Sequence, residues 1–473
     1  MKFRGSVTVF LSLIMGIIMS LIFMTVESAR YSTEKMRIEM ISRMGLESIF
    51  AEYNRELLKE YDLLFIDSSY GNSSSSLTET RDHLKEYIGY NVRPSKGIIS
   101  PGSGEIYGLK LKGAEIANPA YATDNAGSVF KRQAIEAVKN RYGVGIAERA
   151  LELKKEYEGS GIKKEDVEKR REKIREELKD ADLGSKGNKL KKVFDKRRGN
   201  MANIVYGGFF SPKETELQLK GLASYRENKT GIGLVRPDYN PNDFLNERLF
   251  EQYLLWKCSD FTKDLGHSSC NYELEYIING KNTDAANLRE TVTKLFFIRE
   301  AADTMAVFKD SGKQAQAKAT ALPIAAVVAL LLHVDIEEAL TNMILVSWGF
   351  AEAVVDVRVL LGGGRVALVK SEKDWNIKTV LGIPLFMTEK GKSSSVGMSY
   401  RDYLLLLLMT TGQKKKAMRA MDVIEMNMRT KAGNSHFRMD GCLEYLEADL
   451  KFRDRSGRKF EIRRDYSYMN VIE

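Results

Sequence analysis

Twenty consecutive residues without a charge, residues 7–26 (VTVFLSLIMGIIMSLIFMTV), constrain this chain more than any other feature. As an α-helix they rise about 30 Å, which matches the hydrocarbon core of a bilayer. Arg4 precedes the segment, and Glu27 and Arg30 follow it. We therefore predict a transmembrane anchor, represented along its length by Val7, Phe10, Leu13, Gly16, Ser20, Phe23 and Val26.

A cleavable signal peptide is the alternative interpretation of this segment. Signal peptides carry a shorter apolar stretch of about 7–15 residues, followed by small residues at the cut. A cut after Ala29 would place Glu27 at the critical −3 position, whereas cleavage after Ser28 stays open as an alternative. Gly16 and Ser20 lie four residues apart, so they could permit close helix approach or simply face lipid.

Orientation follows from the short N-terminal tail. Residues 1–6 are expected to stay in the cytoplasm, with the remaining chain outside the cell. Arg30, Lys35 and Arg37 follow the span, so the positive-inside rule supports this orientation only weakly. The predicted localisation is a single-pass cell-membrane protein with membrane lipid as its first partner.

The helical pattern continues past the membrane as an amphipathic stalk, residues 27–62. Met36, Met40 and Met44 recur at helical spacing, as do apolar residues between 49 and 61. Such a stalk packs on its own domain or on a partner helix.

The rest of the chain reads as an α+β protein that is predominantly helical. The predicted blocks are a mixed segment 63–145, a charged helical insertion 146–200, a loop-rich linker 201–242, and a helical domain 243–431 with a short hairpin near 365–386. A C-terminal β-hairpin occupies 432–473, with its turn at residues 454–457. A second apolar run, residues 322–334, is too short to cross a bilayer and predicts a buried core helix.

The basic charge is concentrated in one place. The formal net charge is +9, and residues 154–198 contain 17 Lys/Arg against 11 Asp/Glu. Such a segment is typical of a solvated surface or of contact with anionic lipid or polymer. Aromatic residues make up 9% and form no stripe with basic residues, so no nucleic-acid partner is expected.

Catalytic, cofactor and metal motifs give no prediction of a site. Asp260, His267 and Cys270 lie close in sequence, but a local trio in a loop is usually coincidence. Glu338, Glu352 and Asp356 could share one helix face. A buried salt bridge, with Arg358 or Arg365 as partner, or surface exposure is the interpretation that we prefer to acid/base chemistry.

The cysteines do not form a disulfide framework. The chain has three, Cys258, Cys270 and Cys442, and one bridge between Cys258 and Cys270 is conceivable. Isolated buried or free thiols are the interpretation that we prefer.

The N-terminus resembles the TadE/TadG-like pseudopilins of tight-adherence (Flp) pilus systems. The resemblance rests on Arg4-Gly5 before Ser6 and the apolar helix, and on Glu27 and Arg30 at its far end. It implies a candidate processing site between Gly5 and Ser6. The sequence departs from the prepilin pattern at Phe10, where a Glu is usual.

The remaining chain is similar to a poorly characterised family of Gram-positive membrane-anchored proteins. The similar segments are residues 121–124, 130–133, 272–280, 348–356 and 397–403. Together the resemblances imply a non-enzymatic envelope protein that works with protein partners of a pilus or related secretion apparatus. The alternative is a membrane-tethered enzyme acting on envelope polymer.

Overall fold

The computed structural model describes residues 4–92, 108–162, 164–179, 181–196, 200–235 and 240–470. The chain divides into two compact units, which we name by their content. The sheet unit contains Met1–Val129, Asn228–Pro237 and Gly433–Glu473, and the helical unit contains Phe130–Glu227 and Asp238–Ala432. Helices predominate and strands are few, so the predicted α+β class is confirmed.

The sheet unit is organised around strand β5 (Cys442–Arg453). Strands β1 (Ile66–Asp67), β2 (Lys110–Tyr121) and β6 (Lys459–Ser467) all pair with it in antiparallel register. Leu450 of β5 lies opposite Ala114 on one side and Ile462 on the other. The predicted C-terminal hairpin is therefore confirmed as β5–β6, although it is part of a larger sheet.

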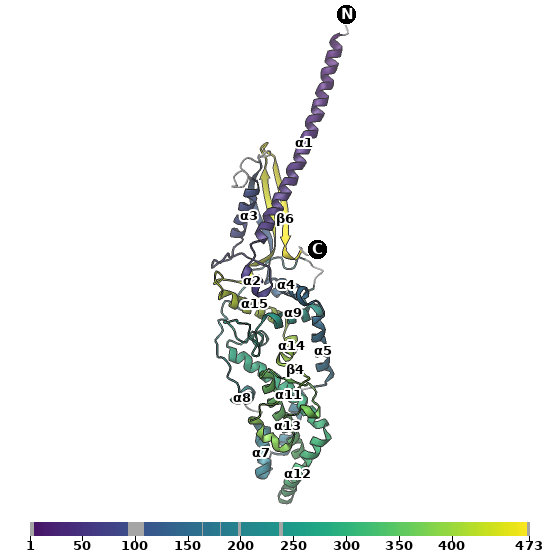
Figure 1. Ribbon diagram of the computed structural model, residues 1–473, viewed down its shortest axis with the longest axis vertical. Coiled ribbons are helices and arrows are strands. Elements are labelled where there is room, and N and C mark those ends of the chain that lie inside the picture. The colour runs from purple at the N-terminus through teal and green to yellow at the C-terminus, as the bar shows by residue number, and fades with distance from the viewer. Residues whose placement is uncertain are drawn as a thin grey trace. The chain divides into compact units, whose positions relative to one another are not determined.

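Two helices cover one face of this sheet (Figure 1). Helix α1 (Arg4–Phe50) contributes its second half, and α3 (Leu77–Val92) lies beside it. Alternate residues of a strand face the same side, which explains why Leu446, Ala448, Leu450 and Phe452 are all buried. They form one core with Ile38, Ile41, Leu46, Leu84 and Ile88.

The predicted stalk 27–62 is wrong in two respects. The helix ends at Phe50, and a separate helix α2 (Arg55–Tyr61) begins where the Asn54 side chain accepts a hydrogen bond from the Leu57 amide. In addition, Met36, Met40 and Met44 are exposed, and the buried stripe is that of Ile38 and Ile41. Two apolar stripes share the helical period, and only contact with the sheet decides which one is buried.

The helical unit contains twelve α-helices within the described residues, counting α4, which enters it from the sheet unit. They are α4 (Asp124–Tyr142), α5 (Ile146–Gly159), α6 (Lys164–Glu177), α7 (Gly184–Asp195), α8 (Met201–Tyr206), α9 (Phe244–Lys257), α10 (Glu273–Asn279), α11 (Asp284–Lys309), α12 (Ser311–Leu332), α13 (Glu337–Leu361), α14 (Tyr400–Thr410) and α15 (Gln413–Arg429). Helix α13 is buried along most of its length and packs against α11.

The predicted hairpin near 365–386 is absent from the described structure. Strand β3 (Arg365–Val366) pairs with β4 (Met398–Ser399), and Val380–Met387 forms a 3₁₀ segment, η5. Val380, Ile383 and Phe386 are all buried. Residues three apart share one side of a 3₁₀ helix, and Pro384 cannot donate to a ladder, so this sequence forms a turn of helix rather than a strand.

The charged insertion 146–200 forms α5, α6 and α7, but it is not wholly solvated. Arg171 of α6 is buried, where it contacts Glu300 of α11 at 3.2 Å and the Phe194 carbonyl at 2.5 Å. Part of this charge is therefore structural. Arg197, Arg198 and Gly199, at the end of the basic tail, lie outside the described residues.

The predicted core helix at residues 322–334 is wrong. Helix α12 ends at Leu332, where His333 adopts a left-handed conformation. Leu322, Val327, Leu330, Leu331 and Val334 are exposed, and α12 is the second helix long and apolar enough to cross a membrane. Its apolar character does not indicate burial, because the large side chains face outward.

Candidate functional site

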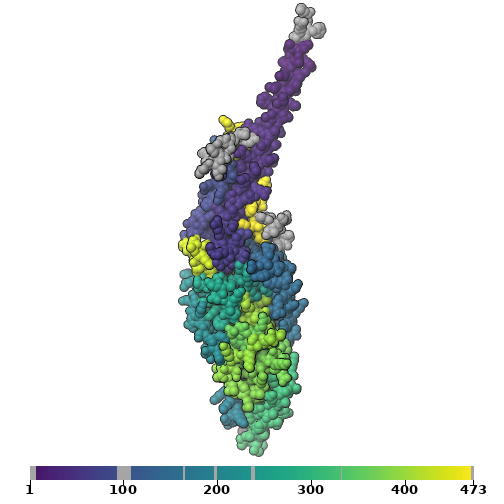
Figure 2. Space-filling view, in the orientation of Figure 1, coloured from purple at the N-terminus to yellow at the C-terminus, as the bar shows by residue number. Residues whose placement is uncertain are grey.

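The apolar half of α1, residues 7–26, is the strongest candidate for a functional element. Its large side chains are exposed on every side of the helix, including Val7, Phe10, Leu13, Phe23 and Val26. Figure 2 shows it as a bare helix that the rest of the described chain does not cover. Water does not favour so much continuous apolar surface. The helix is long and apolar enough to cross a membrane.

Polar groups within the apolar half are satisfied by the helix itself. The hydroxyls of Ser12, Ser20 and Thr25 each donate to a backbone carbonyl three residues earlier, at 2.8 Å. Backbone and hydroxyl groups therefore need no water, which is the condition for a helix in lipid. A Cβ on Gly16 would have no neighbour within 4 Å, so Gly16 and Ser20 lie on the open surface.

A cluster of charged and aromatic side chains marks the end of the apolar half, and we call it the collar. It contains Glu27, Arg30, Tyr31, Glu34, Arg458 and Phe460. Arg458, from the β5–β6 turn, donates to Glu27 and lies 4.0 Å from Glu34. The hydrogen bond to Glu27 raises the pKa of Arg458.

The collar attaches α1 to the sheet at the level where apolar surface ends. Arg30 contacts Glu34 at 3.1 Å, and the Tyr31 ring stacks on Phe460 with centroids 5.7 Å apart. Glu27 and Arg30 were singled out from the sequence, and the structure brings both into the collar. Arg458 was not, because more than 400 residues separate it from Glu27 and no local pattern records that contact.

The structure shows where the other predicted N-terminal residues lie but does not test their roles. Arg4, Gly5 and Ser6 form the beginning of α1, so residues 4–6 of the predicted tail are helical. Lys2 lies outside the described residues. Whether the chain is cut between Gly5 and Ser6 stays a prediction.

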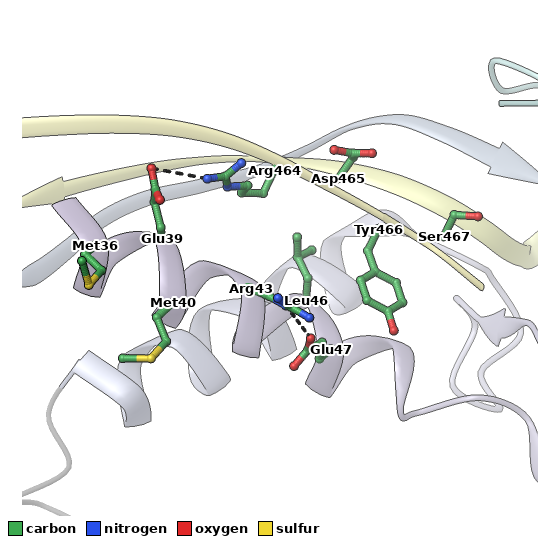
Figure 3. A pocket seen from close by; sticks show the side chains of 10 residues that line it. All are labelled: Met36, Glu39, Met40, Arg43, Leu46, Glu47, Arg464, Asp465, Tyr466 and Ser467. Atoms are coloured by element: carbon green, nitrogen blue, oxygen red, sulfur yellow. Dashed lines mark hydrogen bonds and ion pairs between the residues drawn. The ribbon is translucent and has the colours of Figure 1, made fainter. Parts of the chain in front are cut away.

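A groove runs beside the packed half of α1 (Figure 3). It has a volume of about 780 Å³ and lies between α1 and β6. Met36 and Met40 line it from the helix, and Glu39 reaches across it to Arg464 at 3.4 Å. The exposed methionines are flexible apolar side chains of the kind found on adaptable protein contacts.

The acidic residues of α13 do not form an open site. Glu352 and Asp356 are buried with Asp303, Arg299 and Lys370 in a cluster that we call the ion network. Lys370 Nζ lies 2.6 Å from Asp356 and 3.9 Å from Asp303, and it donates to Glu352.

The other residues considered with this helix, Glu338, Arg358 and Arg365, are not members of the ion network. Glu338 is exposed near the start of α13. The salt bridge that we expected exists, but its partners are not those considered. Arg358 donates to backbone carbonyls, including those of Val205 and Phe386, and Arg365 Nη1 to the carbonyl of Gly397.

Asp260, His267 and Cys270 do not act on one another. Asp260 contacts Arg401 at 3.0 Å, His267 Nδ1 contacts Glu273 at 2.8 Å, and the Cys270 thiol donates to Asp284 at 3.4 Å. Burial raises the pKa of the Cys270 thiol, which keeps it protonated. Cys258, Cys270 and Cys442 are all buried and none of them forms a disulfide, so the conceivable bridge between the first two is not formed. Among the described residues no cluster of three or more His, Cys, Asp or Glu could hold a metal ion.

Comparison with known proteins gives one match. A family model described as "Family of unknown function (DUF5702)" matches residues 179–454. Comparisons with curated proteins and with solved structures found no match. The matched region runs from the end of the charged insertion through the later helices of the helical unit and into β5. Because it covers more than half of the 473 residues, the chain belongs to this family of unknown function, DUF5702.

Proposed function

We propose that this protein is a non-enzymatic, membrane-anchored component of the cell envelope that serves a tight-adherence-type pilus or a related secretion apparatus. The observation that carries the proposal is the apolar half of α1, which is exposed on all sides and ends at the collar. A bilayer surrounds a spanning helix, so it accounts for apolar surface on every face.

The orientation that we propose places the N-terminus in the cytoplasm and both units outside the cell. The collar supports placing the membrane boundary near Glu27, since charged groups there already have partners outside the apolar half. The pilus assignment rests on the resemblance of residues 4–30 to pseudopilins. The exposed methionines beside the groove offer a surface for a protein partner of that apparatus.

Anchoring is tested with the full chain in cell membranes. Leu13→Arg combined with Ile17→Arg places two charges near the middle of the span, at about 2.5–3.5 kcal/mol each on an insertion scale. We expect the natural chain to stay in the membrane pellet after alkaline carbonate extraction and the double variant to leave it. Met36→Arg, at an exposed position beyond the collar, is the matched control and should stay in the pellet.

Two results would contradict the anchor. One is recovery of the natural chain in the soluble fraction with a new N-terminus near Tyr31, which would identify a cleaved signal. The other is equal retention of the double variant and the natural chain. An epitope added after Glu473 tests orientation, since external protease should remove it from intact cells.

The pilus assignment needs a separate test. Deleting the gene in its own host should abolish pilin in the sheared surface fraction. The natural gene should restore it, and the Leu13→Arg/Ile17→Arg gene should not. Unchanged piliation in the deletion strain would refute this part while leaving the anchor intact.

No described observation favours the tethered enzyme. That alternative requires acids converging in an open cleft, and Glu352 and Asp356 are instead sealed in the ion network.

A further inference from the structure

The turn between β5 and β6 carries an excess of positive charge. Residues 451–459 (KFRDRSGRK) contain five Lys/Arg and one Asp. The acid, Asp454, accepts hydrogen bonds from the Arg458 amide at 2.7 Å and from the Ser456 hydroxyl at 2.5 Å. It therefore has a structural role in closing the turn, whereas most of the cations point to something outside the turn.

Contacts with α1 place this turn beside the end of the apolar half (Figure 1). Arg458 of the turn donates to Glu27, the first residue after the apolar half. Farther along both elements, Arg464 of β6 contacts Glu39 of α1 at 3.4 Å. Strand β6 therefore runs beside α1 and away from the apolar half. In a chain anchored by that half, the β5–β6 turn lies at the surface of the bilayer.

Three cations form a row across this end of the sheet, and we call them the basic row. Lys110 of β2 lies directly opposite Arg453 of β5, and Arg453 lies directly opposite Lys459 of β6. Side chains directly opposite in an antiparallel sheet share one face, with Cβ atoms about 4.5–5.5 Å apart. All three are exposed, as is Arg455 in the turn, and none of the four has a carboxylate partner among the described residues.

The basic row is unfavourable for the sheet itself, because like charges directly opposite one another are destabilising. Protection of edge strands explains a charge at Lys110 and Lys459, but a charge of either sign interrupts edge pairing. Farther from the turn on the same face of β5, Lys451 is followed by Asp449 and Glu447. Positive charge is therefore concentrated at the end of the sheet beside the bilayer, where a negative surface would offset the repulsion.

We propose that the basic row and Arg455 bind the headgroups of anionic phospholipids in the leaflet next to the collar. Lys and Arg bind phosphate oxygens through charge-assisted hydrogen bonds. The Tyr31 ring of the collar is 46% exposed, which suits the aromatic belt at a membrane boundary. A soluble polyanion offers the same phosphates, but the position of the row at the end of the span favours lipid. This proposal rests on the anchor of the proposed function and adds a second attachment to the same membrane.

The full chain in vesicles of defined composition tests this attachment. Cys258, Cys270 and Cys442 are buried, so Ser456→Cys in the exposed turn provides the accessible thiol for a fluorophore. The vesicles contain phosphatidylcholine alone or with about 30% phosphatidylglycerol. Acrylamide, a neutral quencher, reports how far water reaches the fluorophore. We expect the anionic lipid to at least halve the quenching constant, and about 0.5 M NaCl to restore most of it, because salt screens the attraction.

Two matched double variants separate the basic row from positive charge in general, since each removes two cations. Lys110→Gln/Lys459→Gln should give the same quenching in both kinds of vesicle. Arg55→Gln/Lys59→Gln, at exposed positions of α2 beyond the far end of α1, should behave as the natural chain. In detergent without lipid, the urea midpoint of the row variant should be no lower than that of the natural chain, since repulsion from Arg453 is relieved.

Three results would overturn the proposal. The first is equal quenching of the natural chain in the two kinds of vesicle, or the full lipid effect in Lys110→Gln/Lys459→Gln, with the chain retained by the vesicles in alkaline carbonate. That result leaves the anchor intact. The second is release of the natural chain from both kinds of vesicle in carbonate, which refutes the anchor and this proposal together. The third is protection of the fluorophore in pure phosphatidylcholine by a soluble glycerol-phosphate polymer, which would identify a polyanion outside the membrane as the ligand.

Discussion

Replacing Lys370 by Met should destabilise the helical unit severely. The Lys370 ammonium lies within 4 Å of three carboxylates, those of Asp303, Glu352 and Asp356, all of them buried. Burial lowers the pKa of Lys370, but attraction to these acids outweighs it and holds the pKa above its ordinary value. Without the lysine, Arg299 alone faces three buried acids.

The size of the effect follows from these contacts. At an effective dielectric constant of 20, two charges 4 Å apart attract by roughly 4 kcal/mol before desolvation is counted, and Lys370 and Asp356 lie closer, at 2.6 Å. Removing the ammonium also removes the free-energy cost of burying it, which offsets part of the lost attraction. Breaking a buried ion pair leaves about 3–5 kcal/mol of net destabilisation. That corresponds to a roughly 160- to 5,000-fold change in the unfolding equilibrium constant.

Urea unfolding of the full chain in detergent measures this change. The three tryptophans, Trp256, Trp348 and Trp375, all lie in the helical unit, so their fluorescence reports on it. Lys373→Met, an exposed lysine three residues away, removes the same charge without the buried contacts and should cost less than about 0.5 kcal/mol.

The pH dependence gives a second check on the same variant. Burial raises the pKa of Asp303 well above its ordinary value, and loss of Lys370 raises it further. A carboxyl with a raised folded-state pKa contributes stability at low pH that is lost as pH rises through that pKa. The deficit of Lys370→Met should therefore be smaller at pH 5 than at pH 8. Equal stability of Lys370→Met and Lys373→Met at pH 8 would refute the reasoning.

Three further changes have clear expected outcomes. Burial raises the pKa of Asp422 to about 6, so the stabilisation that its carboxyl contributes falls as pH rises from 4 to 6. Asp422→Asn should remove about 3 kcal/mol of this pH dependence from the free energy of unfolding measured by urea titration. Gly45→Ala would place a Cβ 2.6 Å from buried Ile88 and should lower the melting temperature at a cost of about 1–3 kcal/mol, whereas Gly89→Ala, with no neighbour within 4 Å, should raise it slightly. Arg358→Lys should destabilise by at least about 2 kcal/mol in urea, because one ammonium cannot satisfy the buried carbonyls that the guanidinium holds.

Local signals account for where several elements begin and end. Helix α11 begins after Thr283, whose side chain accepts a hydrogen bond from the Ala286 amide, and the end of α13 at Leu361 coincides with a run of three glycines. The β5–β6 hairpin has its turn where the sequence places Asp454 and Gly457. These features depend on hydrogen bonds between neighbouring turns or adjacent strands, so a short window of sequence contains the information.

Features that depend on distant contacts could not be predicted in the same way. Nothing near Glu352 indicates that its cation is Lys370, or that Arg299 completes the ion network from another helix. Met36 and Ile38 both belong to apolar stripes, and only the position of the sheet decides that Ile38 is buried. Periodicity identifies which residues share a face, but it does not identify what that face contacts.

The two apolar helices differ in a way that separates their roles. Residues 7–26 are apolar around the whole circumference, and the hydroxyls of Ser12, Ser20 and Thr25 bond within the helix, which fits apolar surroundings on every side. Helix α12 packs one side on its own unit and exposes large side chains on the other. Apolar surface on every side of a helix therefore favours a bilayer as its surroundings, whereas α12 already has protein on one side.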